Sequence, residues 1–168
     1  MLQQTGNSSH RSKKMQGTTD FLVEYGKLPP QVIELEQAVL GALMLERDAL
    51  TAVIDILKKE YFYKESHQRI YEAIMNLFGR SEPVDILTVA NELKSMRVFQ
   101  EVGGGEYLAE LTSRVASSAN IEYHAGIIMQ KYIQRELIRV SSMIIKEAYD
   151  DSIDIFDLLD SAEKQLYN

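Results

Sequence analysis

Apolar residues recur at helical spacing along a stretch of about thirty residues that runs from Asn120 to Tyr149. The stretch contains no proline and a single glycine, Gly126, and Asn120 is suited to cap the start of a helix. At 1.5 Å per residue the predicted helix is about 45 Å long, which is more than one small domain needs to cover its core. Its second half carries the wider apolar face. We therefore predict that the first half is anchored in a globular body and that the second half projects from it.

A second amphipathic helix is predicted after the acidic turn at residues 150–152, with Asp154 as its cap. The short turn makes this helix antiparallel to the end of the long one, so the two form a helical hairpin. A projecting apolar helix needs partners, and a second chain is the expected partner beside the hairpin's own second helix. We place the predicted oligomer interface at six hairpin positions: Leu137, Val140, Ile144, Ile145, Leu158 and Leu159.

The first helix of the chain is predicted to begin in the Pro29-Pro30 dipeptide, with proline in the first turn. Its apolar residues leave a narrow polar face, and Gly41 inside it would let a neighbouring helix approach closely. The predicted polar face consists of Gln31, Glu34, Glu36 and Gln37.

Four further helical segments separate this helix from the long one. Counting the helix at Pro29-Pro30 as the first of the chain, Asp48 is the predicted cap of the second helix and Asp85 is the predicted cap of the fourth. The third helix is expected to turn Phe78 inward, and the fifth is expected to begin at Glu106. No alternating strand pattern competes with these assignments. The predicted fold class is all-α, with a compact helical head followed by a long helix and a C-terminal helical hairpin.

The domain organisation follows from these elements. Residues 1–28 are polar and lack periodicity, so we predict a disordered tail there. A helical head is predicted over residues 29–118. The long helix and the hairpin, leading to a linker region, are predicted over residues 119–168.

Composition narrows the classes of function. The 168 residues carry a net charge of −7 and no cysteine, so a disulfide framework and thiolate chemistry are excluded. An acidic body binds phosphate poorly by itself, so this part of the protein is not expected to grip nucleic acid. The apolar runs are too short to span a membrane and no secretion signal is present, so a cytoplasmic location is expected.

No constellation for catalysis, cofactor binding or metal binding emerges from the sequence. The glycine run at residues 103–105 lacks the Lys-Ser/Thr of a phosphate-binding loop, so we interpret it as a turn. The three histidines, His10, His67 and His124, are scattered, which disfavours a metal site. For His67 we expect a hydrogen-bonded and partly buried side chain near the aromatic residues 61–63.

A basic stripe on the long helix is the one charged pattern with two open interpretations. Lys131, Arg135 and Arg139 follow one another at intervals of four residues, so they share one face of the helix. The stripe is either a solvated face with Glu136 nearby or a binding site for an acidic surface of a partner.

A series of short motifs follows in a particular order from Pro29 onward. These motifs are Pro29-Pro30, Ile33–Gly41, Phe62-Tyr63, His67, Ile70, Glu72–Ile74, Pro83–Thr88, Glu101–Gly104, Tyr107–Leu111, Ser118–Asn120, Tyr123 and Ala125. In this order and spacing they resemble the N-terminal domain of the DnaB-type replicative helicase family, over nearly the whole chain from Pro29 onward. Ala116 departs from the family, which often has proline there, and the tail before Pro29 matches nothing.

The resemblance implies a role in DNA replication. Parent enzymes of this family form hexameric rings that hydrolyse nucleotide and move along single-stranded DNA. Their N-terminal domains pair through heads and hairpins into a collar, which docks the C-terminal domain of a DnaG-type primase. ATP and Mg, and most DNA contacts, are expected in a separate ATPase domain of the parent, and no cofactor is expected in this fragment. We therefore expect this sequence to be the collar piece of a longer protein.

A free-standing helical adaptor that binds primase or helicase is the alternative. The two hypotheses differ in whether the uncut gene continues into an ATPase domain with a Walker A sequence. A small enzyme is a third class, which no site constellation supports.

Overall fold

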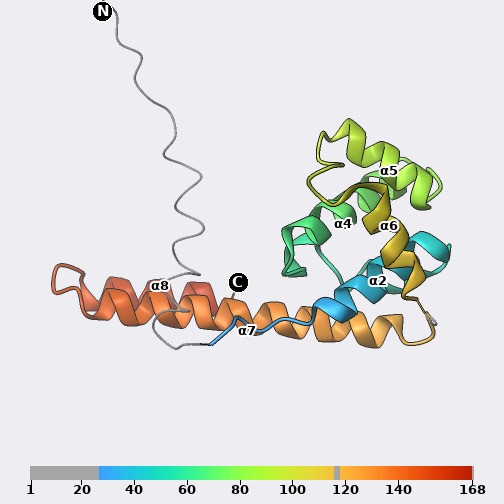
Figure 1. Ribbon diagram of the computed structural model, residues 1–168. Helices are drawn as coiled ribbons and strands as arrows, with labels where there is room; N and C mark the ends of the chain where they lie inside the picture. Colours follow the sequence, from blue (N-terminus) through green and yellow to red (C-terminus); the bar gives the residue numbers. More distant parts are fainter. Residues whose placement is uncertain (1–26, 116–117, 168) are drawn as a thin grey trace, which may run out of the picture. The chain divides into compact units, whose positions relative to one another are not determined.

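The computed structural model describes residues 27–115 and 118–167, and these residues divide into two compact units. The head unit comprises residues 31–133. Among the described residues, the hairpin unit joins residues 27–30 with residues 134–167. Secondary structure in the described residues is entirely helical (Figure 1), which confirms the predicted all-α class. Almost all of the predicted tail, residues 1–26, lies outside the described residues.

The division between the units falls inside the long helix α7, between Ile133 and Gln134. Within the head unit, α2 is the central element and packs against α3, α4, α5 and α6. The elements are α2 (Ile33–Leu45), α3 (Ala49–Val53), a 3-10 turn η1 (Lys59–Tyr61), α4 (Glu65–Gly79), α5 (Ile86–Ser95), α6 (Gly104–Ser113), α7 (Ile121–Ala148) and α8 (Ile155–Tyr167).

Two of the predicted helix caps are confirmed. The Asp85 carboxylate accepts hydrogen bonds from the backbone N–H groups of Leu87 and Thr88, at 2.8 and 3.0 Å. The Thr88 hydroxyl accepts from the Asp85 N–H in return, which completes a capping box at the start of α5. At the start of α8, the Asp154 carboxylate accepts from the N–H of Phe156 at 2.8 Å. Both caps satisfy backbone donors that lack a partner within the helix.

Other helix starts differ from the predictions. α2 begins at Ile33, after the proline pair, and the Pro30 carbonyl accepts a hydrogen bond from Arg135 at 2.8 Å. Asp48 makes no side-chain capping bond, because its own backbone is already in the helical region. The helix that follows it, α3, ends at Val53. α6 begins at Gly104, two residues before the predicted start.

The core of the head unit is built around α2. Val39, Leu40 and Leu43 of α2 are almost completely buried. Gly41 confirms the predicted close approach, because a Cβ atom there would lie 2.2 Å from the carbonyl oxygen of Leu111 in α6. Phe78 does not join this core. Its exposed fraction is 42%. Successive side chains of a helix point about 100° apart, so Phe78 faces a different direction from its buried neighbour Leu77.

In the hairpin unit, α8 runs back beside the second half of α7 (Figure 1). The connecting turn is stabilised by Asp150, whose carboxylate accepts from both the N–H and the hydroxyl of Ser152. These hydrogen bonds lower the pKa of Asp150. None of the described helices is long and apolar enough to cross a membrane.

Candidate interaction surfaces and a buried polar cluster

The six predicted interface residues of the hairpin differ in how far they are buried. Val140 and Leu158 are buried, with exposed fractions of 3% and 6%. Leu137, Ile145 and Leu159 leave between 41% and 56% of their surface exposed. The last of the six residues, Ile144, is half-buried. Val140 and Leu158 thus stabilise the hairpin itself, and the exposed members are the ones available to a partner.

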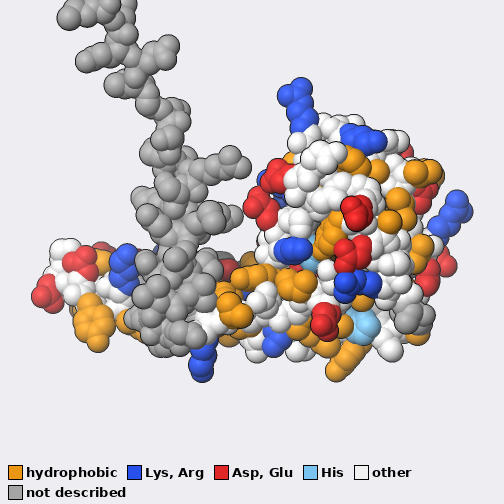
Figure 2. Space-filling model, in the orientation of Figure 1, with side chains coloured by type: hydrophobic (Ala, Val, Ile, Leu, Met, Phe, Trp, Pro, Cys, Tyr) orange, Lys and Arg blue, Asp and Glu red, His pale blue; other side chains and the backbone are white. Residues whose placement is uncertain are grey.

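The exposed apolar surface of the hairpin is larger than the predicted interface. Figure 2 shows apolar side chains on the visible face of this unit. Phe156 and Tyr167 of α8, which the predicted interface omits, are 74% and 90% exposed. Both side chains are apolar, but their positions lie outside the helical stripe that includes Leu158, so the spacing did not select them.

The side chains of the basic stripe make contacts within the chain. Arg135 donates to the Pro30 carbonyl, and Arg139 donates to the Glu136 carboxylate at 2.9 Å. The pair of Arg139 and Glu136 agrees with the interpretation as a solvated face. Lys131 is half-buried. Binding of an acidic partner by these three residues stays a prediction.

A buried polar cluster connects α2, α4 and α6 in the head unit. The Nδ1 atom of His67 lies 2.6 Å from a carboxylate oxygen of Glu36, and its Nε2 atom lies 2.7 Å from the Tyr107 hydroxyl. The exposed fractions of His67 and Glu36 are 0% and 1%. The Tyr63 N–H donates to the other Glu36 oxygen at 2.6 Å. The expected hydrogen bonding of His67 is confirmed, and its side chain is completely buried where partial burial is predicted.

The burial of Glu36 corrects the predicted polar face of the first helix. Glu36 was assigned to that face because its neighbours Glu34 and Gln37 are also polar. Its partner His67 lies 31 positions away in the sequence, so helical periodicity could not reveal the pair. The presence of a glutamate among apolar residues and of a histidine in the resembling motifs was the only signal.

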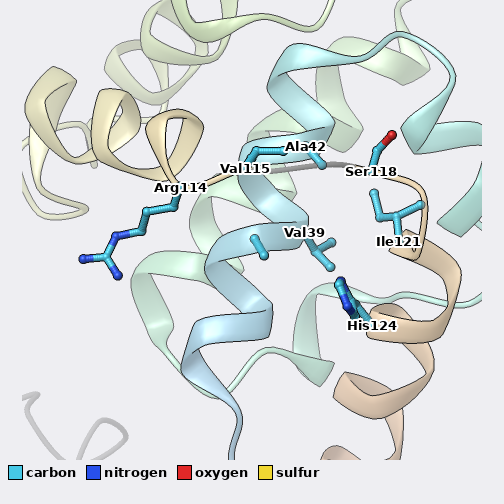
Figure 3. A pocket seen from close by; sticks show the side chains of 8 residues that line it. Val39, Ala42, Arg114, Val115, Ser118, Ile121 and His124 are labelled. Carbon is cyan, nitrogen blue, oxygen red and sulfur yellow. The ribbon is translucent and has the colours of Figure 1, made fainter.

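A cavity of about 150 Å³ lies between α2 and the start of α7. Apolar side chains dominate its lining, and the Arg114 guanidinium points away from it (Figure 3). Arg114 instead pairs with Glu110 at 2.6 Å. Besides Arg114, the polar residues at the cavity are Ser118 and His124. Its lining residues are Ala38, Val39, Ala42, Arg114, Val115, Ser118, Ile121 and His124.

The groups with shifted pKa values lie outside this cavity. Burial raises the pKa of Tyr71 to about 12, and its hydroxyl donates to the Leu57 carbonyl in the core. A hydrogen bond from Lys59 lowers the pKa of Glu72, with Arg69 contributing. These are structural contacts. The described residues also contain no cluster of His, Asp and Glu that could hold a metal ion.

Comparison with known proteins places this fold in a family. The family model described as "DnaB-like helicase N terminal domain" matches residues 28–130. The chain belongs to this family. The recognised resemblance is thereby confirmed, and α2 to the first part of α7 are the matched elements.

Relatives are similar in sequence to this chain over most of its length. The replicative DNA helicase DnaB of Rhodothermus marinus is 46% identical over 142 residues, which cover 84% of this chain and 15% of that protein. The replicative DNA helicase DnaC of Bacillus subtilis is 45% identical, over 88% of this chain and 32% of that protein. The chain therefore spans about a third or less of the length of these relatives.

Solved structures share the fold. The N-terminal domain of the DnaB helicase from Mycobacterium tuberculosis matches with a TM-score of 0.79 and 36% identity, over 83% of this chain and 98% of that one. A DnaB-like replicative helicase, described together with its interactions with primase, matches with a TM-score of 0.66. Its identity is 24%, so this second likeness supports the fold alone.

Proposed function

We propose that this chain acts as the N-terminal domain of a replicative DNA helicase, in ring assembly and primase docking during DNA replication. ATP and Mg would act in another domain of the parent protein, which would also make the main contacts with DNA. Membership of the DnaB-like N-terminal family supports this assignment. So do the relatives, which are replicative helicases and extend well beyond the matched region.

The exposed apolar surface of the hairpin is the observation that carries the assembly role. Leu159 in α8 and Leu137 in α7 leave about half of their surface exposed, although the hairpin already buries Val140 and Leu158. Exposed apolar surface of this kind favours association. A second copy of the chain is the proposed occupant, which gives dimers of the fragment and hexamers of the parent.

Light scattering across a concentration series tests this role. We expect the fragment to associate as its concentration rises and Leu159→Asp to shift it to a monomer, because an unpaired charge would have to be buried in the contact. The matched control is Leu87→Asp, which changes a leucine of the head unit that is 75% exposed. A strictly monomeric fragment, or equal effects of the two variants, contradicts the proposal.

Primase docking is the second part of the proposed function. It is supported by the fold likeness to a helicase described with its primase interactions. The proposed contact residues are Lys131, Arg135 and Arg139 on α7.

Isothermal titration with the C-terminal domain of a DnaG-type primase tests the docking role. Charge reversal of Arg139 to Glu is expected to weaken binding about tenfold, the factor that corresponds to roughly 1.4 kcal/mol. Lys146→Glu, an exposed cation on the same helix, is the matched control and should leave the affinity unchanged. Equal losses in both variants would assign the effect to overall charge and not to the basic stripe.

A free-standing adaptor that binds primase or helicase is the second candidate function. The observation that favours it is the continuous buried core of the head unit, which lets the head fold as a unit. The reading frame of the gene decides between the candidates. An ATPase domain with a Walker A sequence downstream supports the helicase, and a stop codon near residue 168 supports the adaptor.

A further inference from the structure

The second half of α7 carries apolar side chains on two different sides. Val140 marks the side that is buried within the hairpin, with an exposed fraction of 3%. Successive helical residues turn by about 100°, so Ile138 and Ile145 lie about 160° and about 140° around the helix from Val140. Ile145 is 41% exposed, and Tyr149, directly after the helix, is 86% exposed. We call Ile138, Ile145 and Tyr149 the far face of α7.

The N-terminal part of the chain is fastened at the edge of this far face. The Arg135 guanidinium donates to the Pro30 carbonyl at 2.8 Å, across 105 positions of sequence. Pro29 is buried and Pro30 is half-buried, and both prolines belong to the hairpin unit. Arg135 lies about 60° around α7 from Ile138. The start of the blue trace in Figure 1, which contains Pro30, accordingly lies beside α7.

The sequence shortly before this anchor is apolar, in contrast to the rest of the predicted tail. Residues 21–25 lie outside the described residues, and four of these five are apolar, namely Phe21, Leu22, Val23 and Tyr25. Residues 1–20 contain three apolar residues, namely Met1, Leu2 and Met15. Burial of apolar side chains is favourable by about 1.5–3 kcal/mol for each large one. Residues 21–25 therefore gain from a covered position, whereas residues 1–20 do not.

The segment is long enough to cover the far face, and its charge suits that face. From Pro30 back to Phe21, nine residues span at most about 30 Å. From Arg135 to the end of α7 the helix is about 20 Å long. Glu24 is the charged residue of the segment, and exposed Lys146 lies only about 20° around α7 from Arg135. A cation is thus available where the acidic residue would arrive.

We propose that residues 21–25 dock on the far face of α7 in the same chain and cover Ile145. The segment is favoured over a second copy at this face because its anchor at Pro30 holds it nearby, at an effective concentration on the order of millimolar. Leu137 lies about 80° around α7 from Ile145, so its side stays open to a second copy. The docking is independent of the proposed helicase function.

Tryptophan fluorescence reads the position of the segment. The chain has no tryptophan, so a tryptophan introduced by substitution is the only one. We expect blue-shifted emission from Phe21→Trp, because docking shields the indole from water. Leu28→Trp is the matched probe, since Leu28 is 74% exposed, and it should emit as a tryptophan in water. Equal emission from the two probes would overturn the proposal.

A substitution on the far face should release the segment. In the Phe21→Trp protein, Ile145→Asp is expected to abolish the blue shift, because docking would bury an unpaired charge. Leu137→Asp is the matched control, since Leu137 is similarly exposed, at 49%, and lies outside the far face. It should keep the blue shift, and circular dichroism verifies that both variants stay helical. A blue shift that survives Ile145→Asp, or that is lost equally in both variants, contradicts the docking.

Dilution separates docking within one chain from docking on a second copy. An intramolecular contact does not depend on concentration, so the emission of Phe21→Trp should stay blue-shifted across the range in which light scattering shows dissociation. A blue shift that disappears together with the association would place the segment on a second copy and overturn the proposal. A fragment that is monomeric throughout but keeps its blue shift would contradict the assembly role and support the docking.

Discussion

In the head unit, Leu40, Leu43 and Ile74 are almost completely buried, whereas Leu159 and Phe156 of the hairpin unit leave more than half of their surface exposed. Both units consist of amphipathic helices, so the difference does not lie in the type of element. The head has several helices around α2, and each apolar stripe finds a neighbour. The hairpin has two helices, and two helices can cover only one side of each other. The number of helices therefore decides which unit leaves apolar surface exposed.

The largest expected effect is on the buried cluster of the head. His67→Leu leaves the Glu36 carboxylate buried without its strongest side-chain partner, and we expect a loss of about 3 kcal/mol in the free energy of unfolding. Urea denaturation followed by circular dichroism measures it. Tyr107→Phe removes the hydroxyl that contacts Nε2 of His67 and, at longer range, Gln37 and Lys64, and it should cost about 1 kcal/mol. Equal costs for the two variants would contradict the central position of His67.

A somewhat smaller effect is expected where α2 crosses α6. Gly41→Ala places a methyl group against the Leu111 carbonyl, so the two helices must separate, at a cost of about 2 kcal/mol. Thermal denaturation of the variant would show it as a lower Tm. An unchanged Tm would mean that α2 and α6 accommodate the added methyl group without loss of stability.

Val140→Ala should lower the stability of the hairpin unit and leave that of the head unit unchanged. It removes buried methyl groups from the hairpin, and we expect a local loss of about 1 kcal/mol. Hydrogen exchange should accelerate in α8 and stay unchanged in α4 of the head. Equal acceleration in both helices would show that the units unfold together and would remove the contrast between them.

A gain in stability is expected from a substitution at Gly126 of α7. A Cβ atom there meets nothing within 4 Å, so alanine adds no clash and lowers the entropy cost of the helix. Gly126→Ala should stabilise the protein by about 0.7 kcal/mol in thermal denaturation. A lower Tm, or weaker association in light scattering, would indicate that another chain packs closely against this position.

The smallest expected effect is a pH dependence of the stability of the head. A hydrogen bond from Arg80 lowers the pKa of Glu92, as Lys59 lowers that of Glu72. Since the folded pKa lies below the unfolded one, the stabilisation is present above pH about 4.5, the ordinary glutamate value, and is lost as the pH falls through the folded pKa. Tm measured against pH should therefore fall less steeply for Glu92→Gln than for the native protein. Glu163→Gln in the hairpin is the control and should keep the native slope.

Local chemistry was predictable from the sequence, and contacts across the fold were not. Asp85 and Asp154 were identified as caps because a cap depends on residues two or three positions away. Asp48 has the same chemistry, but its backbone lies in the helical region, where its side chain makes no capping bond.

The candidate sites show the same limit. Helical spacing identified an apolar face on the hairpin, but it could not tell that Val140 is covered while Leu137 is exposed, because that depends on where α8 lies. The pair of Glu36 and His67 joins two helices that are distant in sequence. Periodicity within either helix contains no information about the other.

Contact between the backbone of α2 at Gly41 and that of α6 at Leu111 also limits how the head can move. Side chains can change rotamer and let two helices slide, whereas closely apposed backbones have no such freedom. If the two helices slid, Gly41 would have to pass the Leu111 carbonyl, which lies so close that a methyl group at Gly41 would collide with it. The two helices should therefore open as one cooperative unit in native-state hydrogen exchange, with the slowest amides of the molecule on their facing sides.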